Sequence, residues 1–492
     1  MLLKKQRVTK FFPFIHEKVA FTLTMENMNY YRLNDKFILR GWDEFPYAVV
    51  DTQDNKPQFL DKRKFNALTL CNGLVDLSLP FISEHDRKII REFEKIGIVE
   101  PCTKGQKLNV DQEYKKFPIH YVPRVLWSIT GKCNFRCKHC YLSGAEDKYG
   151  ELSHDTVMNI IQQIADCGIM EVALTGGEPL VRDDFFEIVD ALLARNIKIP
   201  QIYSNAYLID EKFLAALKAR NTHPNIILSY DGKGWHDWLR GVEGAEAAIE
   251  RAVPLCRDYG FDVWVEMCIH RLNRNSIRDS VNFIASLGAQ KMRIAGIMEA
   301  GDWNKNKADN SLTSQEILDA VLDYIPQYYA DNMPIDIDLA SSFTATPEKP
   351  DEFQVPSFRK DLTPERNICG CARNILYISP EGRVLPCVPM SGTKVEQMMP
   401  FIQDIGLMEC INHTAWFQIV STKIKDFFAV HDECKSCKWQ KNCWGGCRAE
   451  ALRVEPDNYL AKSPSMCYFL LNNWAQKVID KVKQVRPDVK VA

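Results

Sequence analysis

The spacing of hydrophobic positions changes along the chain, and each pattern predicts a different kind of structure. Near the N-terminus, short apolar runs at residues 37–39, 47–50 and 59–60 are separated by turn-forming residues, which predicts three strands. Residues 65–73 then have a helical pattern closed by a glycine, and Ser83 can cap a second helix. The buried face of that second helix is predicted to contain Ile89, Ile90, Phe93 and Ile96. Three strands followed by two helices are typical of a small winged-helix-like module.

The middle of the chain alternates apolar, β-rich runs with amphipathic helical patterns. Residues 183–195, for example, predict a helix whose apolar side contains Phe185, Ile188, Val189 and Leu192. The predicted strands are residues 125–130, 171–175, 199–204, 226–230, 263–269 and 292–297. Repeated βα units with right-handed crossovers predict an α/β fold with a parallel sheet, either open or curved into a partial barrel. In such folds the chemistry gathers at the C-terminal ends of the strands.

The last third of the chain has a different character. A linking helix after residue 311 and a stretch rich in Pro and Asp lead to a cysteine-dense tail at residues 369–467. Because little regular structure is predicted there, we expect bound metal to supply part of its core. The expected domains are residues 28–102, 120–310, 311–365 and 366–475, for the N-terminal module, the barrel, a linker and the tail.

Composition and charge narrow the class of protein. The 492 residues are 46% hydrophobic and 26% charged, as in ordinary globular proteins. Lys+Arg 62 against Asp+Glu 64 gives a formal net charge of −2, so no general field favours nucleic acid or an acidic membrane. The start at residues 4–14 is basic and then aromatic, without an apolar run long enough for a signal peptide or a membrane span. These features predict a soluble cytoplasmic protein.

Seventeen cysteines is a high count, and eleven of them lie in two tight groups. Without a secretory signal, thiolates that hold metal are favoured over a disulfide framework. The other six mostly lie in apolar segments and are assigned no chemistry, because cysteine is commonly a small buried hydrophobe: Cys71, Cys102, Cys167, Cys256, Cys268 and Cys410.

Three cysteines with the spacing CxxxCxxC follow the first predicted barrel strand directly: Cys133, Cys137 and Cys140. Three thiolates on a four-iron cluster leave one iron open to bind a small molecule. A structural zinc site is the alternative, but it needs a fourth ligand, for which His139 is the nearest candidate. The motif resembles that of the radical S-adenosylmethionine (SAM) superfamily. The resemblance implies a partial (β/α)6 barrel, a [4Fe–4S] cluster that binds SAM, and a 5′-deoxyadenosyl radical that abstracts hydrogen from substrate.

A second motif, Thr-Gly-Gly-Glu-Pro at residues 175–179, follows the second barrel strand. Glycine permits close approach of the backbone to a ligand, although an isolated Gly-Gly pair is usually only a turn. It resembles the superfamily's GGEP motif, which binds the methionine amino group. Polar residues at two later strand ends correspond to superfamily contacts with SAM, or are ordinary strand-end caps. The residues expected to bind SAM are His139, Gly176, Gly177, Glu178, Pro179, Ser204, Asn205, Ser229 and Asp231.

The cysteine pattern of the tail resembles the SPASM domain of peptide-modifying radical SAM enzymes, which carries two auxiliary [4Fe–4S] clusters. The resemblance assigns Cys369, Cys387 and Cys447 to the first auxiliary cluster. Cys371 is additional to that pattern: it is either the fourth ligand of this cluster or a buried free thiol. The second cluster is assigned Cys434, Cys437, Cys443 and Cys467. A pair of zinc ribbons is the alternative for the whole tail.

The N-terminal module resembles the peptide-recognition element of ribosomal-peptide maturases, in its element order and in residues 64–73. In that family the leader of a precursor peptide adds a strand to a sheet edge. A DNA-binding winged helix and an inert cap are the alternatives, and the near-neutral charge disfavours the first.

Together these resemblances predict an enzyme that matures a ribosomally made precursor peptide, most plausibly by forming a thioether, C–C or ether cross-link. Three [4Fe–4S] clusters, SAM and an electron donor such as flavodoxin or ferredoxin are the implied cofactors and partners, in addition to the peptide. The alternatives are protein oxidation of the sulfatase-maturase type and a non-enzymatic zinc-binding adaptor. Polar residues near strand ends, Glu266, Arg293 and Glu299 among them, are more often structural, so no catalytic acid or base is nominated.

Overall fold

The computed structural model describes residues 29–360 and 362–492, so the basic segment at residues 4–14 lies outside the described residues. The chain forms two compact units, Met1–Tyr121 and Val122–Ala492. None of the helices in the described ranges is long and apolar enough to cross a membrane.

The first unit contains the predicted three-stranded meander and two helices, together with strands that were not predicted. Its four-stranded sheet has the order β4-β3-β2-β6, and β1 pairs with β5 in a separate antiparallel ladder. The elements are β1 Tyr30–Leu33, β2 Phe37–Gly41, β3 Ala48–Asp51, β4 Lys56–Phe59, α2 Lys62–Thr69, α3 Glu84–Lys95, β5 Val99–Cys102 and β6 Lys115–Lys116.

The helix boundaries of this unit follow local capping chemistry. The Ser83 side chain accepts a hydrogen bond from Asp86 N, which confirms the predicted start of α3. Ile96 was wrongly predicted to be buried: it is 60% exposed, because it follows the last helical residue and leaves the helix face. The first helix ends at Thr69 and not at Gly73. Gly73 instead turns with φ +74°, and a Cβ there would lie 2.0 Å from Gln106 O.

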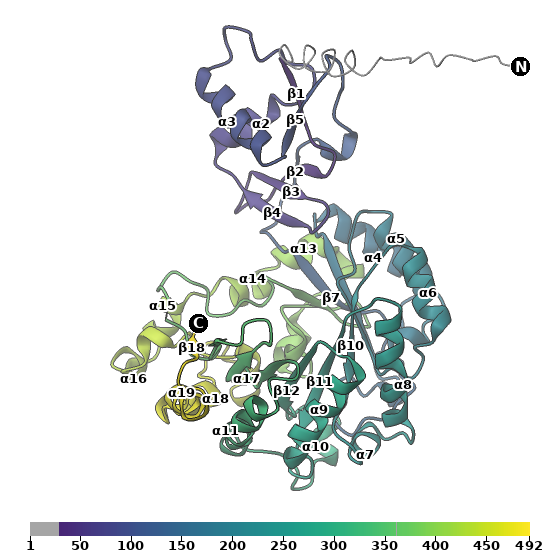
Figure 1. Ribbon diagram of the computed structural model, residues 1–492, viewed down its shortest axis with the longest axis vertical. Helices are drawn as coiled ribbons and strands as arrows, with labels where there is room; N and C mark the ends of the chain where they lie inside the picture. Colours follow the sequence, from purple (N-terminus) through teal and green to yellow (C-terminus); the bar gives the residue numbers. More distant parts are fainter. Residues whose placement is uncertain (1–28, 361) are drawn as a thin grey trace, which may run out of the picture. The chain divides into compact units, whose positions relative to one another are not determined.

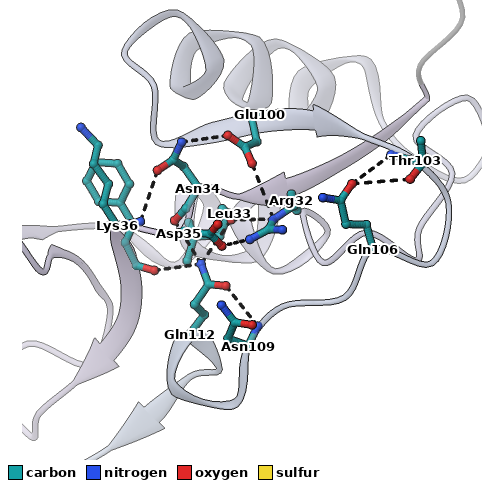
Figure 2. Close-up of polar contacts among 11 residues, drawn as sticks. Arg32, Leu33, Asn34, Asp35, Lys36, Glu100, Thr103, Gln106, Asn109 and Gln112 are labelled. Carbon is teal, nitrogen blue, oxygen red and sulfur yellow. Dashed lines mark hydrogen bonds and ion pairs between the residues drawn. The ribbon is translucent and has the colours of Figure 1, made fainter. Parts of the chain in front are cut away.

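Polar contacts hold the unpredicted part of the first unit together (Figure 2). Gln112 Nε2 donates to the carbonyls of Leu33, Asn34 and Phe37 at 3.0–3.2 Å. Asn34 Nδ2 donates to Glu100 Oε2 at 2.8 Å across the β1–β5 pair. These contacts, and the pairing of β6 with β2, extend the module to Tyr121, beyond the predicted end at residue 102.

The second unit is built on the predicted parallel sheet (Figure 1). Strands β7 to β12 pair in sequence order, each parallel to the next, and helices connect them, which confirms the α/β partial-barrel class. The strands are β7 Arg124–Ser128, β8 Glu171–Thr175, β9 Gln201–Ser204, β10 Asn225–Ser229, β11 Val263–Ile269 and β12 Lys291–Gly296. The helices are α4 His154–Asp166, α5 Phe185–Leu193, α6 Glu211–Ala219, α7 His236–Arg240, α8 Ala245–Asp258 and α9 Ile277–Leu287.

The sheet continues beyond the predicted strands at both edges. After α10 Trp303–Asn306 and the linking helix α11 Ser314–Ala330, β13 Asp336–Leu339 pairs parallel to β12, and β14 Phe343–Ala345 pairs antiparallel to β13. At the other edge, β16 Leu376–Ile378 from the cysteine-rich tail pairs parallel to β7 and antiparallel to β17 Val384–Leu385. The tail therefore shares a sheet with the barrel, and the division at residues 310, 365 and 475 remains a prediction.

The tail contains more regular structure than the sequence pattern predicted. Its helices are mostly a single turn or two, and such short helices are marginal in isolation, so packing of side chains such as Trp416 and Ile419 must stabilise them. The elements are α12 Ile402–Ile405, α13 Leu407–Asn412, α14 Thr414–Ser421, α15 Ile424–Ala429, α16 Asp432–Lys435, α17 Arg448–Val454, α18 Pro464–Leu471 and α19 Trp474–Val485, with a small ladder of β15 Glu352–Phe353 and β18 Lys490–Val491.

Candidate active site

A cavity of about 430 Å³ opens at the C-terminal ends of the parallel strands. Residues of strands β7 to β12 and of the loops that follow them line it, together with Val388 and Pro389 of the tail. Eight of the predicted site residues contribute to its wall: Cys133, Cys137, Gly176, Gly177, Glu178, Ser204, Asn205 and Ser229. This is the strand edge at which the βα pattern placed the chemistry.

The loop that carries the first three cysteines is shaped by backbone donors to sulfur. Cys133 Sγ accepts from Phe135 N and Cys140 Sγ accepts from Gly144 N, both at 3.4 Å. Such donors stabilise thiolates, which a cluster requires. Within residues 29–360 and 362–492, no three His, Cys, Asp or Glu side chains converge so as to hold a single metal ion. The thiolates of a four-iron cluster bind separate iron atoms, so cluster ligands need not converge on one point.

The Gly176–Gly177 pair packs directly against this cysteine loop. A Cβ on Gly177 would lie 2.2 Å from Lys132 O, and one on Gly176 would lie 2.6 Å from Thr130 O. Gly177 N donates to Thr130 O at 2.8 Å. The glycines are therefore required for the approach of one loop to another, whereas the sequence predicted an approach to ligand.

Glu178 is a carboxyl that the fold buries almost completely, with 1% of its surface exposed. Its Oε2 accepts from Asn205 N at 2.7 Å and its Oε1 accepts from Leu180 N at 3.2 Å. Burial raises the pKa of Glu178 to about 7, although these two backbone donors oppose the shift. A nearby cation would remove the cost of ionising it, as expected for a residue that receives an ammonium group.

The raised pKa of Glu178 predicts a specific pH dependence of stability. The unfolded carboxyl ionises near 4.5 and the folded one near 7, so its stabilising contribution is present below pH 4.5 and is lost as pH rises through 7. Relative to wild type, the free energy of unfolding of Glu178→Gln is expected to rise by up to about 3 kcal/mol between pH 5 and pH 8. Denaturant unfolding of SAM-free protein measures this difference, with the exposed Glu211→Gln as control. An equal offset at both pH values would contradict the expectation.

Asp231 does not line the cavity, although the sequence grouped it with the SAM contacts. It is fully buried, and its carboxylate accepts from Arg240 Nε at 2.7 Å and from Cys268 N at 2.9 Å. Burial alone would raise the pKa of Asp231, but Arg240 and His236 outweigh it and hold that pKa well below its usual range. Asp231 therefore fixes Arg240, and a direct contact with SAM remains only a prediction.

Two other predicted SAM residues also lie outside the cavity lining. Burial lowers the pKa of His139 to about 3, so this imidazole is neutral. Pro179 is buried beneath the glycine turn. Their roles toward SAM remain predictions.

Arg240 is a site residue that the sequence pattern did not reveal. It ends α7, lines the cavity, and places Nη1 4.0 Å from Cys137 Sγ. The same helix end holds the cysteine loop, because Lys138 N donates to Leu239 O at 2.8 Å. No local motif connects these groups, since the arginine and the cysteine are 103 residues apart.

Residues 127–284 match the model of the radical SAM superfamily. The chain is a radical SAM enzyme. SAM and a [4Fe–4S] cluster are accordingly its cofactors. The PqqA peptide cyclase of Gluconobacter oxydans is 25% identical over 333 residues, which cover 67% of this chain and 86% of that protein. The AdoMet-dependent heme synthase of Nitratidesulfovibrio vulgaris is 24% identical over 368 residues, which cover 70% of this chain and 92% of that protein.

The fold of this radical SAM enzyme is similar to that of Streptococcus suis SuiB, solved with its precursor peptide SuiA bound. The TM-score is 0.62 at 17% identity, and the match covers 89% of this chain and 99% of SuiB. At this identity the likeness concerns the fold alone. It confirms the combination of a radical SAM barrel with an N-terminal module and a C-terminal extension.

The radical SAM enzyme gathers its remaining motif cysteines into two sets within the tail. In the first, Cys371 hydrogen-bonds to Cys369 and Cys387, with Cys447 also close. Cys371 N donates to Cys369 Sγ at 3.4 Å. All four thiols therefore face a common region, which accommodates Cys371 as a fourth ligand.

The thiols of the second set also lie close together. Burial raises the pKa of Cys443 to about 11, and the neighbouring thiols of Cys467, Cys434 and Cys437 add to this shift. Gly445 N donates to Cys443 Sγ at 3.3 Å, as in the barrel loop. The proximity of the thiols within each set, with backbone N–H donors to sulfur, fits the thiolate ligands of a cluster whose iron–sulfide core is cationic.

Proposed function

We propose that this radical SAM enzyme modifies a ribosomally made precursor peptide and forms a cross-link within it after hydrogen-atom abstraction. The observation that carries the proposal is the presence in one chain of the radical SAM cavity, two further cysteine sets and an N-terminal module with an open strand edge. Two relatives support it by their names and contents, a PqqA peptide cyclase and a SuiB structure with bound precursor peptide.

Each side of the cavity has a separate task in this proposal. Cys133, Cys137 and Cys140 hold the barrel cluster, and Glu178 receives the methionine amino group. Ser204, Asn205 and Ser229 are positioned to bind the methionine carboxylate and the ribose. SAM bound at the reduced cluster supplies a 5′-deoxyadenosyl radical that takes a hydrogen atom from substrate. Tyr203, Glu266 and Arg293 also line the cavity, and we assign them to the segment of peptide that reacts.

The proposed role of the tail is to accept an electron from the peptide during cross-linking. Forming one new bond at the expense of two bonds to hydrogen removes two electrons and two protons from the peptide. One hydrogen atom leaves in 5′-deoxyadenosine, while the second electron needs another acceptor and its proton needs a base. The two cysteine sets of the tail would hold two auxiliary [4Fe–4S] clusters that supply this acceptor, for three clusters in all. A flavodoxin or ferredoxin would supply the electron that starts each cycle.

Strand β4 is the proposed site for the leader, because it is the terminal strand in its sheet. Leu60 N donates to Tyr47 O at 2.9 Å, and paired and unpaired positions alternate in an antiparallel ladder. Phe59 and Pro57 therefore direct their backbone groups away from β3, and proline at this edge costs no ladder hydrogen bond. The Phe59 ring, 41% exposed and stacked on Phe45 at 4.3 Å, offers an apolar surface beside that edge. An added peptide strand can use both features.

The edge-strand proposal predicts that Phe59→Pro binds the precursor about tenfold more weakly than Phe59→Ala. Both variants lose the aromatic ring, but only proline removes the outward N–H that a leader strand would pair with. Isothermal titration calorimetry with the intact precursor measures the difference. Equal affinities of the two variants would place the leader elsewhere.

Tetrapyrrole modification is a second candidate, because the heme synthase of Nitratidesulfovibrio vulgaris aligns over 92% of its own length. The N-terminal unit favours the peptide. Incubating the reconstituted enzyme separately with precursor peptide and with an iron porphyrin precursor of heme distinguishes the two by product analysis. Sulfatase-maturase-type oxidation of a folded protein is excluded if the leader alone competes for binding.

A further inference from the structure

Arg448 is a buried cation that lacks a carboxylate partner among the interactions of the described residues. It is the first residue of α17, directly after Cys447, and only 1% of it is exposed. Its Nη1 donates to Tyr459 O at 2.9 Å and to Ala461 O at 2.7 Å. Nε donates to Gly446 O at 3.3 Å, and Nη2 donates to Gly445 O. All of these acceptors are neutral carbonyls, and the guanidinium also lies 5.3 Å from the Phe427 ring.

A buried guanidinium with only neutral acceptors is costly, because desolvation of a charge is repaid mainly by a counter-charge. Cysteines of both tail sets interact electrostatically with Arg448 and would supply that counter-charge as thiolates. Cys369, Cys371 and Cys447 belong to the first set and Cys443 to the second. The guanidinium therefore lies near ligands of both proposed auxiliary clusters.

The turn that precedes Arg448 directs two carbonyl oxygens at its guanidinium. Gly445 and Gly446 have φ +85° and +78°, and a Cβ on Gly446 would lie 2.4 Å from the Ser463 side chain. A Cβ on Gly445 would lie 3.2 Å from Arg448 Nη2. Residues with side chains would be strained and crowded there. The turn connects Cys443 to Cys447, which belong to different sets, and its carbonyls accept from the same guanidinium.

We propose that Arg448 is a fixed counter-charge shared by the two auxiliary clusters, which it holds at a higher reduction potential than their thiolates alone would allow. The proposal rests on the proposed function, because it requires iron in both tail sets. A four-iron core of charge 2+ with four thiolates has a net charge of about −2, and reduction adds one more negative charge. A cation in a low-dielectric site therefore stabilises the reduced form more than the oxidised form. Arg448 is a positioning residue and does not contact substrate.

The test uses the full-length chain in which Cys133, Cys137 and Cys140 are replaced by alanine, so that only tail clusters contribute. Anaerobic redox titration followed by electron paramagnetic resonance is performed on this background with Arg448→Gln and Arg448→Lys. The control is Arg220→Gln, which removes a partly exposed arginine that pairs with Asp190 of a barrel helix. At a fixed potential, Arg448→Gln is expected to lower the ratio of reduced to oxidised cluster at least tenfold, which equals about 59 mV for a one-electron couple. Arg448→Lys and Arg220→Gln are expected to titrate like the background.

An Arg448→Gln protein that retains about eight irons and titrates unchanged would overturn the proposal. If Arg448→Gln loses iron, the lysine variant decides. Lysine keeps the positive charge but cannot donate to all four carbonyls. If Arg448→Lys retains the iron and the reduction potential of the background, the residue acts as a counter-charge. Loss of iron in both variants would show that Arg448 acts only through its hydrogen bonds to the carbonyls and not through its charge, which overturns the proposal. Absence of tail iron in the unsubstituted background would instead refute the proposed cluster content.

Discussion

Replacing Cys133, Cys137 and Cys140 together by alanine is expected to remove about four of about twelve irons and to abolish SAM cleavage. Cys133 and Cys137 line one cavity with Glu178 and the glycine pair, and Cys140 belongs to the same loop. Iron analysis of anaerobically reconstituted protein measures the first effect. Chromatography of 5′-deoxyadenosine after chemical reduction measures the second.

The matched control replaces three buried cysteines outside the motifs, Cys167, Cys256 and Cys410. None of these three lines the cavity or belongs to either tail set, and each is buried as a small hydrophobic side chain. Their alanine variant is expected to keep full iron content and SAM cleavage. Stoichiometric zinc with little iron in the unsubstituted protein would refute the cluster assignment as a whole.

Deleting residues 1–121 is expected to weaken precursor binding by roughly a hundredfold, because several main-chain hydrogen bonds and the Phe59 surface are lost together. The chain divides into compact units after Tyr121, so this cut is sounder than one at residue 102, which would leave β6 and Gln112 behind. Calorimetry with the intact precursor measures the loss.

The same truncated enzyme is expected to retain SAM cleavage when chemically reduced, because the whole barrel cavity lies in Val122–Ala492. Separation of the two activities is the informative result. A truncated enzyme that binds and modifies its precursor like the full chain would show that the N-terminal unit is not a recognition element.

Local patterns predicted the barrel well, because each of its strands is an apolar run followed by turn or cap residues. Two strands, β8 and β11, begin and end where the pattern places them. The cap at Ser83 was equally predictable, since its partner is three residues away. The resemblance of the tail to the SPASM pattern also predicted which cysteines lie together, including Cys369 and Cys387, which are well separated in the sequence.

Features that depend on distant pairing were not predictable in this way. Strand β1 pairs with β5, about 70 residues later, and β16 joins β7 from the far end of the barrel sequence. The strand-end position of Asp231 predicts a SAM contact, which remains a prediction, whereas its ion pair with Arg240 could not be read from the pattern. The carbonyl acceptors around Arg448 likewise come from a turn and a later loop, which no periodicity signals.

Mass spectrometry of the precursor peptide tests the central claim most directly. Candidate peptides are sought among the products of small open reading frames beside the gene. Each candidate is incubated anaerobically with reconstituted enzyme, SAM and a reductant. The account predicts a peptide that has lost two hydrogen atoms, formed together with one equivalent of 5′-deoxyadenosine and absent with the Cys133, Cys137 and Cys140 variant. An unchanged peptide, with 5′-deoxyadenosine formation stimulated instead by a porphyrin, would contradict it.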